Sequence, residues 1–284
     1  MRKEFPPWLK KRIGDLERVN DLLSLLSHHR LHTICQSAHC PNLPECFSRG
    51  TATFLILGNI CTRNCTFCMV KKGKPLPVDT QEPERIKEMA KLLGLKYVVI
   101  TSVTRDDLPD GGAEHFKRTI RTLHEEGMKA EVLVPDFQGD KGALVKVVEE
   151  KPEVFAHNLE TVPRLYPSVR PQADYDRSLL LLRWAKEVSP SQITKSGIMV
   201  GMGEREEEVI EVMKSARDAG VDIFTIGQYL PPSPRHFPLH SFIHPETFHY
   251  YEREGEKMGL LVIAGPWVRS SYRAETAWKT VVKK

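Results

Sequence analysis

The stretch ATFLILGNICTRNCTFC, from Ala52 to Cys68, is the most informative part of the sequence about the fold. Its apolar start, Ala52–Leu57, has the length and composition that are typical of a buried β-strand. Three cysteines with the spacing C-x3-C-x2-C follow directly, at Cys61, Cys65 and Cys68. No G-x-G-x-x-G sequence follows this strand, which counts against a dinucleotide-binding fold. The stretch therefore predicts a buried strand that leads into a cysteine-rich loop.

Downstream of this stretch, short apolar runs alternate with helical patterns. Further strands are expected at Tyr97–Thr101, Ala130–Val134, Val154–His157, Ile193–Val200 and Asp222–Ile226. Helices are expected at Glu84–Leu93, Glu114–Glu126, Gly142–Glu150, Arg177–Val188 and Glu204–Ala219, and several of them stop at a glycine. Six strands that alternate with helices predict a parallel sheet with right-handed crossovers.

A doubly wound open sheet and a barrel both fit this alternation. We favour an α/β fold of the partial (β/α)6-type TIM barrel, with the site at the C-terminal ends of the strands. Upstream, we expect a helix at Leu16–Leu26 and a loop from Cys35 to Phe47. The tail from Pro245 to Lys284 adds a helix, a strand-like run at Leu260–Ala264 and a short final helix.

Composition excludes several classes of protein. The chain has 284 residues, 40% of them hydrophobic and 27% charged, which is unlike a disordered chain, a fibrous repeat or a coiled coil. Its net charge of +4 is mild, and basic and acidic residues are mixed along the chain, so we expect no nucleic-acid partner. No apolar run reaches the length of a membrane span, and no secretory pattern opens the chain. We expect a soluble protein of the cytoplasm.

All six cysteines lie between positions 35 and 68, in two sets of three. The first set is Cys35, Cys40 and Cys46, with the spacing C-x4-C-x5-C. The second set is Cys61, Cys65 and Cys68. Structural zinc normally takes four protein ligands, whereas a four-iron cluster takes one ligand per iron. Each set is therefore one ligand short of closing a cluster. Two alternatives are disulfides, which a reducing cytoplasm disfavours, and a zinc site that recruits His39.

The second set resembles the signature of the radical S-adenosylmethionine (SAM) enzymes, C-x3-C-x-aromatic-C, with Phe67 as the aromatic residue. A fuller resemblance, from about Arg30 to about Ala274, is to the lipoyl synthase family, which has both cysteine triplets. That family also has the segments TSV-x-RDDLPDGGA, HN-x-ET, K-S-x-I/L-M, QYL-x-PS and RSSY. In this chain they begin at Thr101, His157, Lys195, Gln228 and Arg269.

The resemblance implies three parts within one structural domain. Residues 1–50 would be an N-terminal extension with the auxiliary cysteines, residues 51–230 the radical SAM partial barrel, and residues 231–284 a C-terminal extension with RSSY. It also implies two [4Fe–4S] clusters and SAM as cofactors. The cluster at Cys61, Cys65 and Cys68 would leave one iron to SAM, which yields a radical that abstracts hydrogen from an aliphatic chain.

By the same resemblance, the reaction inserts two sulfur atoms at carbons 6 and 8 of an octanoyl group on a carrier-protein lysine. The auxiliary cluster would supply the sulfur, and an external donor the electrons. The carrier would be a lipoyl domain or the glycine-cleavage H protein. Two other classes stay open: another two-cluster radical SAM enzyme that thiolates a different substrate, and a metal-stabilised binding module without catalytic activity.

Ser271 is the expected fourth ligand of the auxiliary cluster by resemblance, and the catalytic residue. An alkoxide oxygen is an unusual partner for this iron, so that corner of the cluster should be labile. Ser270 is a weaker candidate, because the motif could be offset by one residue. From the residues alone, either serine could instead cap the helix that begins near Ala274.

Other polar residues of the matched segments are candidates for contact with SAM. Asn158 and Glu160 follow the fourth strand, where they could bind the methionine or ribose groups; Asn158 could also cap a helix. Lys195 begins a strand, and a surface lysine is its alternative. Arg105, Asp106 and Asp107 could orient cofactor or carrier lysine, or simply form a turn. The cofactor-binding set is Phe67, Thr101, Asn158, Glu160 and Lys195.

Overall fold

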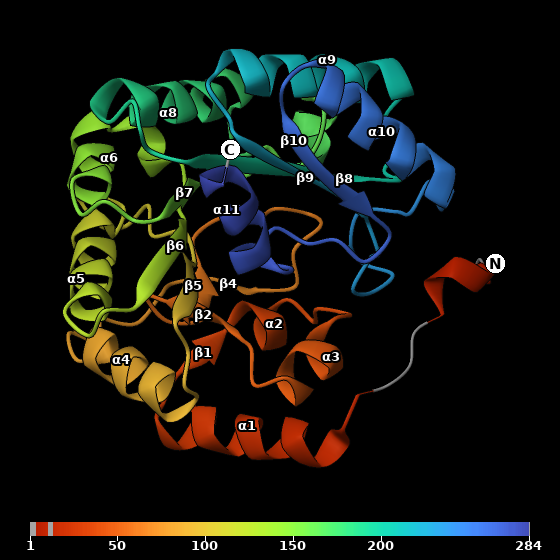
Figure 1. The fold of residues 1–284 in the computed structure, drawn as a ribbon. Helices are drawn as coiled ribbons and strands as arrows, with labels where there is room; N and C mark the ends of the chain where they lie inside the picture. Colours follow the sequence, from red (N-terminus) through yellow and green to blue (C-terminus); the bar gives the residue numbers. More distant parts are fainter. Residues whose placement is uncertain (1–3, 11–13, 284) are drawn as a thin grey trace.

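The computed structural model describes residues 4–10 and 14–283, which form a curved sheet inside a partial ring of helices (Figure 1). Eight strands are hydrogen-bonded in the order β1-β2-β5-β6-β7-β8-β9-β10. Only β1 runs antiparallel to its neighbour, β2. The sheet strands are His32–Thr33 (β1), Thr53–Ile56 (β2), Tyr97–Ser102 (β5), Lys129–Leu133 (β6), Val154–Ala156 (β7), Thr194–Val200 (β8), Ile223–Gln228 (β9) and Leu261–Gly265 (β10).

Helices follow the parallel strands and cover the outer face of the sheet. They are Glu82–Leu92 (α4), Ala113–His124 (α5), Lys141–Val148 (α6), Tyr175–Val188 (α8), Glu206–Asp218 (α9) and Pro245–Lys257 (α10). The predicted helix ends are confirmed where a glycine takes the left-handed conformation: Gly94 has φ 65° and Gly220 has φ 84°. The α/β fold and the partial barrel are thus as the alternation predicts.

The core lies between this helical layer and the sheet. Buried side chains of β2, β5 and β6 pack with those of α4, α5 and α6, for example Phe54, Ile100 and Phe116. A second cluster joins β8 and β9 to α8, α9 and α10, for example Phe224 and Phe248. The opposite face of the sheet, inside the barrel, is partly polar and forms the wall of the site described below.

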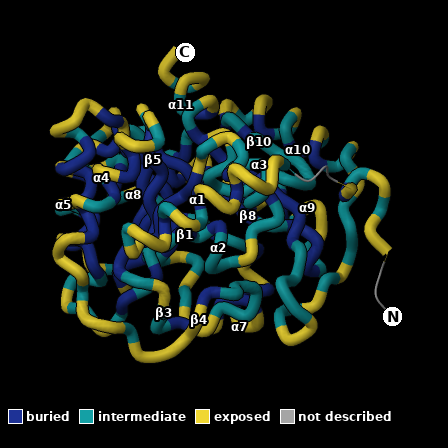
Figure 2. The backbone as a smooth tube through the Cα atoms, turned by 90° about the horizontal axis from the view of Figure 1, so that it is seen from below, coloured by how far each residue is buried: buried dark blue, intermediate teal, exposed yellow. Residues whose placement is uncertain are grey.

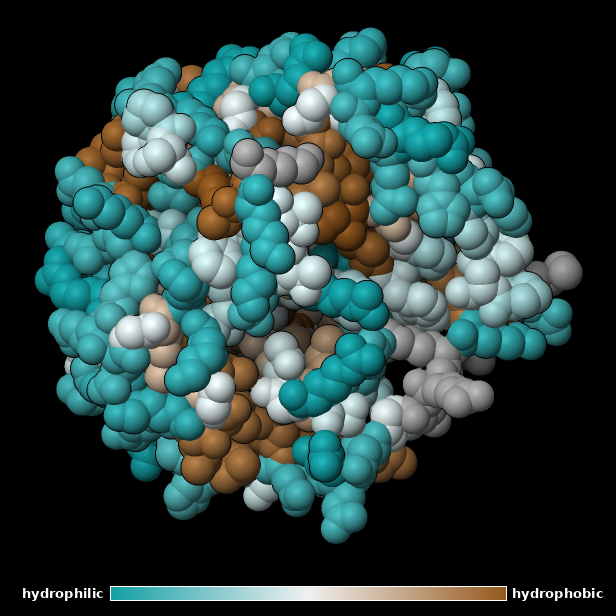
Figure 3. All heavy atoms as spheres, viewed as in Figure 1, coloured by the Kyte–Doolittle hydropathy of each residue, from teal (hydrophilic) through white to brown (hydrophobic). Residues whose placement is uncertain are grey.

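The C-terminal helix Ala274–Val282 (α11) covers the end of the barrel where strands begin. Trp278 packs against Tyr97, the first residue of β5, with ring centroids 5.5 Å apart. The ammonium group of Lys129, the first residue of β6, lies 4.9 Å from the Trp278 ring. Figure 3 shows this face, mostly hydrophilic, with apolar side chains gathered beside α11. Figure 2 shows α11 at the opposite end of the molecule from β3, β4 and α7.

The segment upstream of the first parallel strand is more regular than predicted. The helix Leu16–His28 (α1) is confirmed, but the predicted loop from Cys35 to Phe47 contains two short helices, Ile34–Ser37 (α2) and Leu43–Ser48 (α3). Thr33 caps α2, because its Oγ accepts the Gln36 N–H at 3.2 Å. Pro44 lies in the first turn of α3, where a proline costs no hydrogen bond. The proline read as a helix breaker therefore starts a helix.

Both ends of the chain add strands to the sheet. Strand β1 pairs with β2, and β10 pairs along its whole length with β9. The strand-like run at Leu260–Ala264 is thus confirmed as a strand, and it extends the parallel sheet beyond the six strands expected. Remaining short elements are Pro7–Leu9 (η1), Ile60–Cys61 (β3), Lys71–Lys72 (β4), Phe137–Gly139 (η2), Pro163–Leu165 (η3) and Tyr166–Val169 (α7).

Candidate active site

A cavity of about 330 Å³ lies at the C-terminal ends of the parallel strands. Cysteines of both triplets line it, although Cys46 does not. Much of the wall is apolar and includes Val99, Leu133, Ile198 and Met199. Its polar lining residues include Arg63, Thr101, Glu131, Asp136, His157, Asn158, Glu160, Arg170, Ser270 and Ser271. The tertiary structure therefore brings together residues from both ends of the chain.

The loop that carries the second triplet presents free thiols in a setting suited to iron. The sulfur of Cys61 accepts hydrogen bonds from the backbone N–H groups of Arg63 and Thr104, at 3.5 and 3.4 Å. Burial, and then the nearby thiols of Cys65 and Cys61, raise the pKa of Cys68 to about 12. Such thiols lose their protons only to a strongly positive centre such as iron. Three free thiols on one loop, with backbone N–H donors to one of the sulfurs, fit a cluster site.

Arg63, between the first two cysteines of this loop, fixes the loop to its neighbours. Its guanidinium group binds Asp106 at 2.7 and 2.9 Å and Asp136 at 2.6 Å. The side chain of Asp136 is completely buried. Burial alone would raise the pKa of Asp136, but the hydrogen bond and charge of Arg63 outweigh it and lower the value to about 2. The loop is thus held by a buried ion pair.

The RDD segment is structural in this arrangement. Arg105 binds Asp107 through two hydrogen bonds of 2.9 Å and donates to Leu57 O at 3.3 Å. Asp106 binds Arg63, as described above. The segment therefore forms a turn that braces the cysteine loop.

The first triplet lies on α2, α3 and the turn between them. Burial, and then the neighbouring thiols of Cys40 and Cys46, raise the pKa of Cys35 to about 12. Two hydrogen bonds join this region to the distant RSSY segment. Asn42 Nδ2 donates to Trp267 O at 2.7 Å, and the Tyr272 hydroxyl donates to Glu45 Oε1 at 3.1 Å. The first triplet and RSSY therefore belong to one local structure.

Ser270 and Ser271 both line the cavity. The helix-capping alternative is wrong for both, because the N-cap of α11 is Arg273 and no side chain caps it. Ser270 Oγ instead donates to Asn158 Oδ1 at 3.2 Å. Close packing holds the segment here: a Cβ on Gly227 of β9 would lie 2.1 Å from Val268 O. A bare glycine is what allows this approach.

Asn158 and Glu160 form a half-buried polar pair just after the end of β7. Asn158 Nδ2 donates to Glu160 Oε1 at 3.0 Å, and the region caps no helix, so that alternative for Asn158 is wrong. Glu160 adopts a left-handed backbone with φ 68°, and its own backbone bridges to Ile198 of β8. Burial raises the pKa of Glu160, and the charge of Arg170 opposes the increase.

The other predicted cofactor residues occupy different positions. Phe67 and Thr101 line the cavity, and the Thr101 hydroxyl donates to Leu133 O at 3.0 Å. Lys195 is buried, with 1% of its surface exposed, so the surface-lysine alternative is wrong. Its ammonium group binds Glu131 Oε1 at 2.8 Å, and Tyr97 donates to the other oxygen of Glu131 at 2.7 Å. Glu131 lines the cavity, and Lys195 lies behind it.

His157 is a site residue that sequence reasoning missed. Its Nδ1 donates to Val134 O at 2.9 Å, whereas Nε2 is buried without a hydrogen-bond partner. Burial, and then the charge of Arg170, lower the pKa of His157 to about 4, so the ring is neutral. Two more cavity residues, Ser102 and Arg170, carry a buried polar atom without a hydrogen-bond partner. Unpaired polar groups on a cavity wall fit a polar cofactor such as SAM.

Sequence reasoning also missed Arg63, Arg170 and Asp136. Arg63 and His157 stand inside motifs already quoted, within C-x3-C and at the head of HN-x-ET. Their positions inside these motifs could have identified both as candidate site residues. Arg170 and Asp136 lie outside every quoted motif, and only folding brings them to the cavity.

The alternatives for the cysteines find no support. All six are free thiols, so no disulfide forms. Among residues 4–10 and 14–283, no three Cys, His, Asp or Glu side chains are placed to hold a single metal ion, as the zinc site with His39 requires. A cluster differs, because each thiolate binds its own iron and the sulfurs need not meet at one point.

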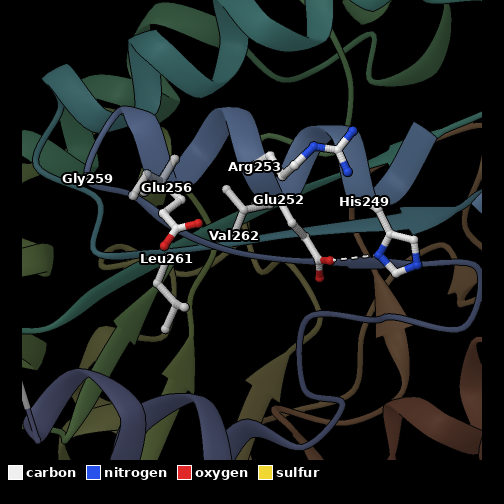
Figure 4. Close-up of a pocket in the computed structure, with 8 residues that line it drawn as sticks. His249, Glu252, Arg253, Glu256, Gly259, Leu261 and Val262 are labelled. Atoms are coloured by element: carbon white, nitrogen blue, oxygen red, sulfur yellow. Dashed lines mark hydrogen bonds and ion pairs between the residues drawn. The ribbon is translucent and has the colours of Figure 1, made fainter. Parts of the chain in front are cut away.

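A second cavity, of about 410 Å³, lies outside the barrel between α10 and β10 (Figure 4). Its polar lining residues are His249, Glu252, Arg253 and Glu256, and Glu252 binds His249 at 3.2 Å. It contains no predicted site residue. Among the residues that the structure describes, no helix has the length and apolar character of a membrane span.

Comparison with known proteins supports the class that this fold and cavity define. The sequence model of the Radical SAM superfamily matches residues 55–226. Among solved structures, that of Streptococcus suis SuiB bound to S-adenosylmethionine superposes with a TM-score of 0.61 at 13% identity, over 88% of this chain and 55% of that one. Methylornithine synthase superposes with a TM-score of 0.56 at 18% identity, over 87% and 81%. The chain is a radical SAM enzyme.

Sequence relatives narrow the class further. The lipoyl synthase of Caldanaerobacter subterraneus is 58% identical over 95% of both chains. That of Caldicellulosiruptor saccharolyticus is 54% identical over 99% of this chain and 100% of its own, and that of Pseudomonas putida W619 is 51% identical over 95% and 81%. The chain belongs to the lipoyl synthase family. It is therefore a sulfurtransferase that uses SAM and [4Fe–4S] clusters, as the motifs predict.

Proposed function

We propose that the enzyme uses this cavity to insert two sulfur atoms at carbons 6 and 8 of an octanoyl group that is bound to a carrier-protein lysine. Cys61, Cys65 and Cys68 hold the cluster that binds SAM. Cys35, Cys40 and Cys46, with Ser271, hold the auxiliary cluster that supplies the sulfur. The observation that carries this proposal is that thiols of both triplets line one cavity.

The chemistry of the substrate explains this arrangement. Carbons 6 and 8 have no acidic proton and no leaving group, and SAM with a reduced cluster supplies a radical that can activate them. The chain's own residues position and shield the reactants. The apolar wall, with Val99, Leu133 and Ile198, suits an alkyl chain and excludes water from it.

Four predicted cofactor contacts are on the cavity wall, and one is not. Phe67, Thr101, Asn158 and Glu160 are proposed to contact SAM directly, which their position on the wall supports. Lys195 is proposed to act through Glu131: its charge fixes the carboxylate that reaches the cavity. Lys195 is then a positioning residue and not a direct ligand.

The partners are proposed from the family. The substrate is an octanoylated lipoyl domain or glycine-cleavage H protein, and an external protein donates electrons. We infer a cytoplasmic location, which rests on the reduced thiols that both clusters need. No nucleic acid or membrane takes part in this proposal.

Mass spectrometry of an octanoylated carrier tests the function. The carrier is incubated anaerobically with reconstituted enzyme, SAM and a reductant. We expect its octanoyl group to gain two sulfur atoms. A carrier that gains no sulfur, under conditions where SAM is cleaved, would contradict the proposed reaction.

Two triple variants test the division of labour between the triplets. A variant with Cys35, Cys40 and Cys46 all changed to alanine should hold roughly four irons instead of roughly eight. It should still cleave SAM and make no thiolated product. The matched variant with Cys61, Cys65 and Cys68 changed to alanine should keep the auxiliary iron and lose SAM cleavage. Loss of cleavage in both would refute the division.

A further inference from the structure

The rim of the cavity carries uncompensated positive charge on two segments. Residues 69–78 contain Lys71, Lys72 and Lys74, all exposed, and no acidic residue lies between Glu45 and Asp79. Residues 231–244 contain exposed Arg235, and no acidic residue lies between Asp222 and Glu246. We refer to these two segments together as the basic rim.

Both segments of the basic rim adjoin the cysteine loop. Strand β4 pairs with β3 so that Lys72 lies opposite Cys61, and the Lys72 ammonium donates to Cys65 O at 3.0 Å. The second segment is attached to the same loop, because Phe237 N–H donates to Thr66 O at 2.9 Å. The first residues of the segments, Met69, Val70 and Pro232, line the cavity itself. The two charged segments therefore lie beside the cavity.

Among the described residues, the lysines and the arginine of the basic rim form no ion pair, whereas many other surface bases of this chain do. In the part of the chain that the structure describes, Lys87, Lys91, Arg121 and Lys214 each bind a carboxylate. None of the ion pairs of the described residues includes a lysine of residues 69–78, or Arg235. Leu76, in the same loop, is 72% exposed, the most among the exposed large hydrophobic side chains. A positive surface with one apolar protrusion is suited to an acidic protein surface.

Resting on the proposed function, we propose that the basic rim docks an acidic surface of the protein that carries the acyl chain. A cavity of about 330 Å³ admits an acyl chain and cannot admit a protein domain. The carrier body must therefore stay outside, against the mouth, while its acyl-lysine enters. Complementary charge at that contact steers association and sets the orientation in which the acyl group arrives.

The test compares two substrates on charge-reversed enzyme. The variant is Lys71→Glu/Lys74→Glu/Arg235→Glu, which leaves Lys72 in place because Lys72 contacts the cysteine loop. For the octanoylated carrier, we expect kcat/KM at low salt to fall by about tenfold or more, and its dependence on ionic strength to weaken. For a short octanoyl-lysine peptide without acidic residues, kcat/KM should stay within about twofold, because a peptide needs no docking surface.

A matched control reverses the same amount of charge elsewhere. Lys214, Lys257 and Lys279 lie on the outer helices α9 and α10 and on α11, and their triple glutamate variant should treat both substrates like the wild type. An unchanged kcat/KM for the carrier in the rim variant overturns the docking proposal, and so does an equal loss with the peptide. A wild-type enzyme that thiolates neither substrate refutes the proposed function instead, so the two failures are distinguishable.

Discussion

Ser270 Oγ donates a 3.2 Å hydrogen bond to Asn158 Oδ1, and 112 positions of sequence separate the two residues. This bond connects the RSSY segment, which carries the proposed auxiliary ligand, to the polar pair proposed to contact SAM. This hydrogen bond therefore links the two proposed cofactor sites directly. The two neighbouring serines differ in this arrangement, because Ser270 binds Asn158, whereas Ser271 is the proposed ligand of the auxiliary cluster.

Single substitutions of Ser270 and Ser271 should separate the hydrogen bond to Asn158 from the proposed ligation of the auxiliary cluster. Ser270→Ala removes the bond to Asn158 and should weaken SAM binding by about two- to tenfold, the value of one hydrogen bond, with iron content unchanged. Ser271→Ala should lower the yield of thiolated product with SAM cleavage retained. Iron analysis, equilibrium SAM binding and product mass spectrometry measure these effects. Equal effects of the two substitutions would contradict the assignment.

Ser271→Cys should retain both clusters and slow sulfur transfer. A thiolate is a better ligand for cluster iron than an alkoxide, so the labile corner becomes more stable. We expect roughly eight irons per chain and a lower rate of product formation in single-turnover assays. A rate at or above that of the wild type would show that the serine oxygen does not set the lability.

His157 offers a test that separates support of the fold from ligand binding. Asparagine can donate to Val134 O as Nδ1 does, but it has no group at the position of Nε2; glutamine has the reverse property. We expect His157→Asn to keep the stability of the wild type at pH 7 and to bind SAM about two- to tenfold more weakly. His157→Gln should bind SAM more tightly than His157→Asn. The opposite order would contradict a ligand contact at Nε2.

Buried neutral His157 also makes stability depend on pH. Its pKa is lowered from 6.5 to about 4, so the unfolded chain binds the proton more readily than the folded one. Folded-state stability should therefore fall as pH drops below 6.5, by about 2 kcal/mol between pH 7 and pH 5. Urea unfolding of wild type and His157→Asn at both pH values measures it. The variant should lose this contribution, and identical pH profiles would refute it.

The buried ion pair of Arg63 should be necessary for the cysteine loop. Asp136→Asn leaves part of the Arg63 charge unpaired in the interior and should cost about 3 kcal/mol, with loss of iron from the SAM site. Asp79→Asn, at an exposed pair with Arg85, should cost less than about 1 kcal/mol. Since the pKa of Asp136 is about 2, the wild-type pair should stay intact between pH 5 and pH 8. Denaturant unfolding together with iron analysis of both variants measures these effects. Equal losses of stability in the two variants would contradict the role of the Arg63–Asp136 pair in holding the cysteine loop.

The strands and the cysteine sites could be predicted because their signals are local. Apolar runs of strand length, helical periodicity and terminal glycines lie within a few residues of the elements they define, and cysteine spacing lies within one loop. The short helices α2 and α3 were missed because proline reads as a breaker when its position in the turn is unknown. The strand β10 was recognised, but its place in the parallel sheet depends on pairing with β9.

The sequence alone determined the fold class, the two cysteine triplets and the family. Only the tertiary structure decided what the remaining polar residues do. It paired Lys195 with Glu131, Arg63 with two aspartates and Ser270 with Asn158, and it left Nε2 of His157 buried without a hydrogen-bond partner. The physical reason is that a buried polar group must find its partner in space, and in these three pairs that partner lies 64, 73 and 112 positions away in the chain.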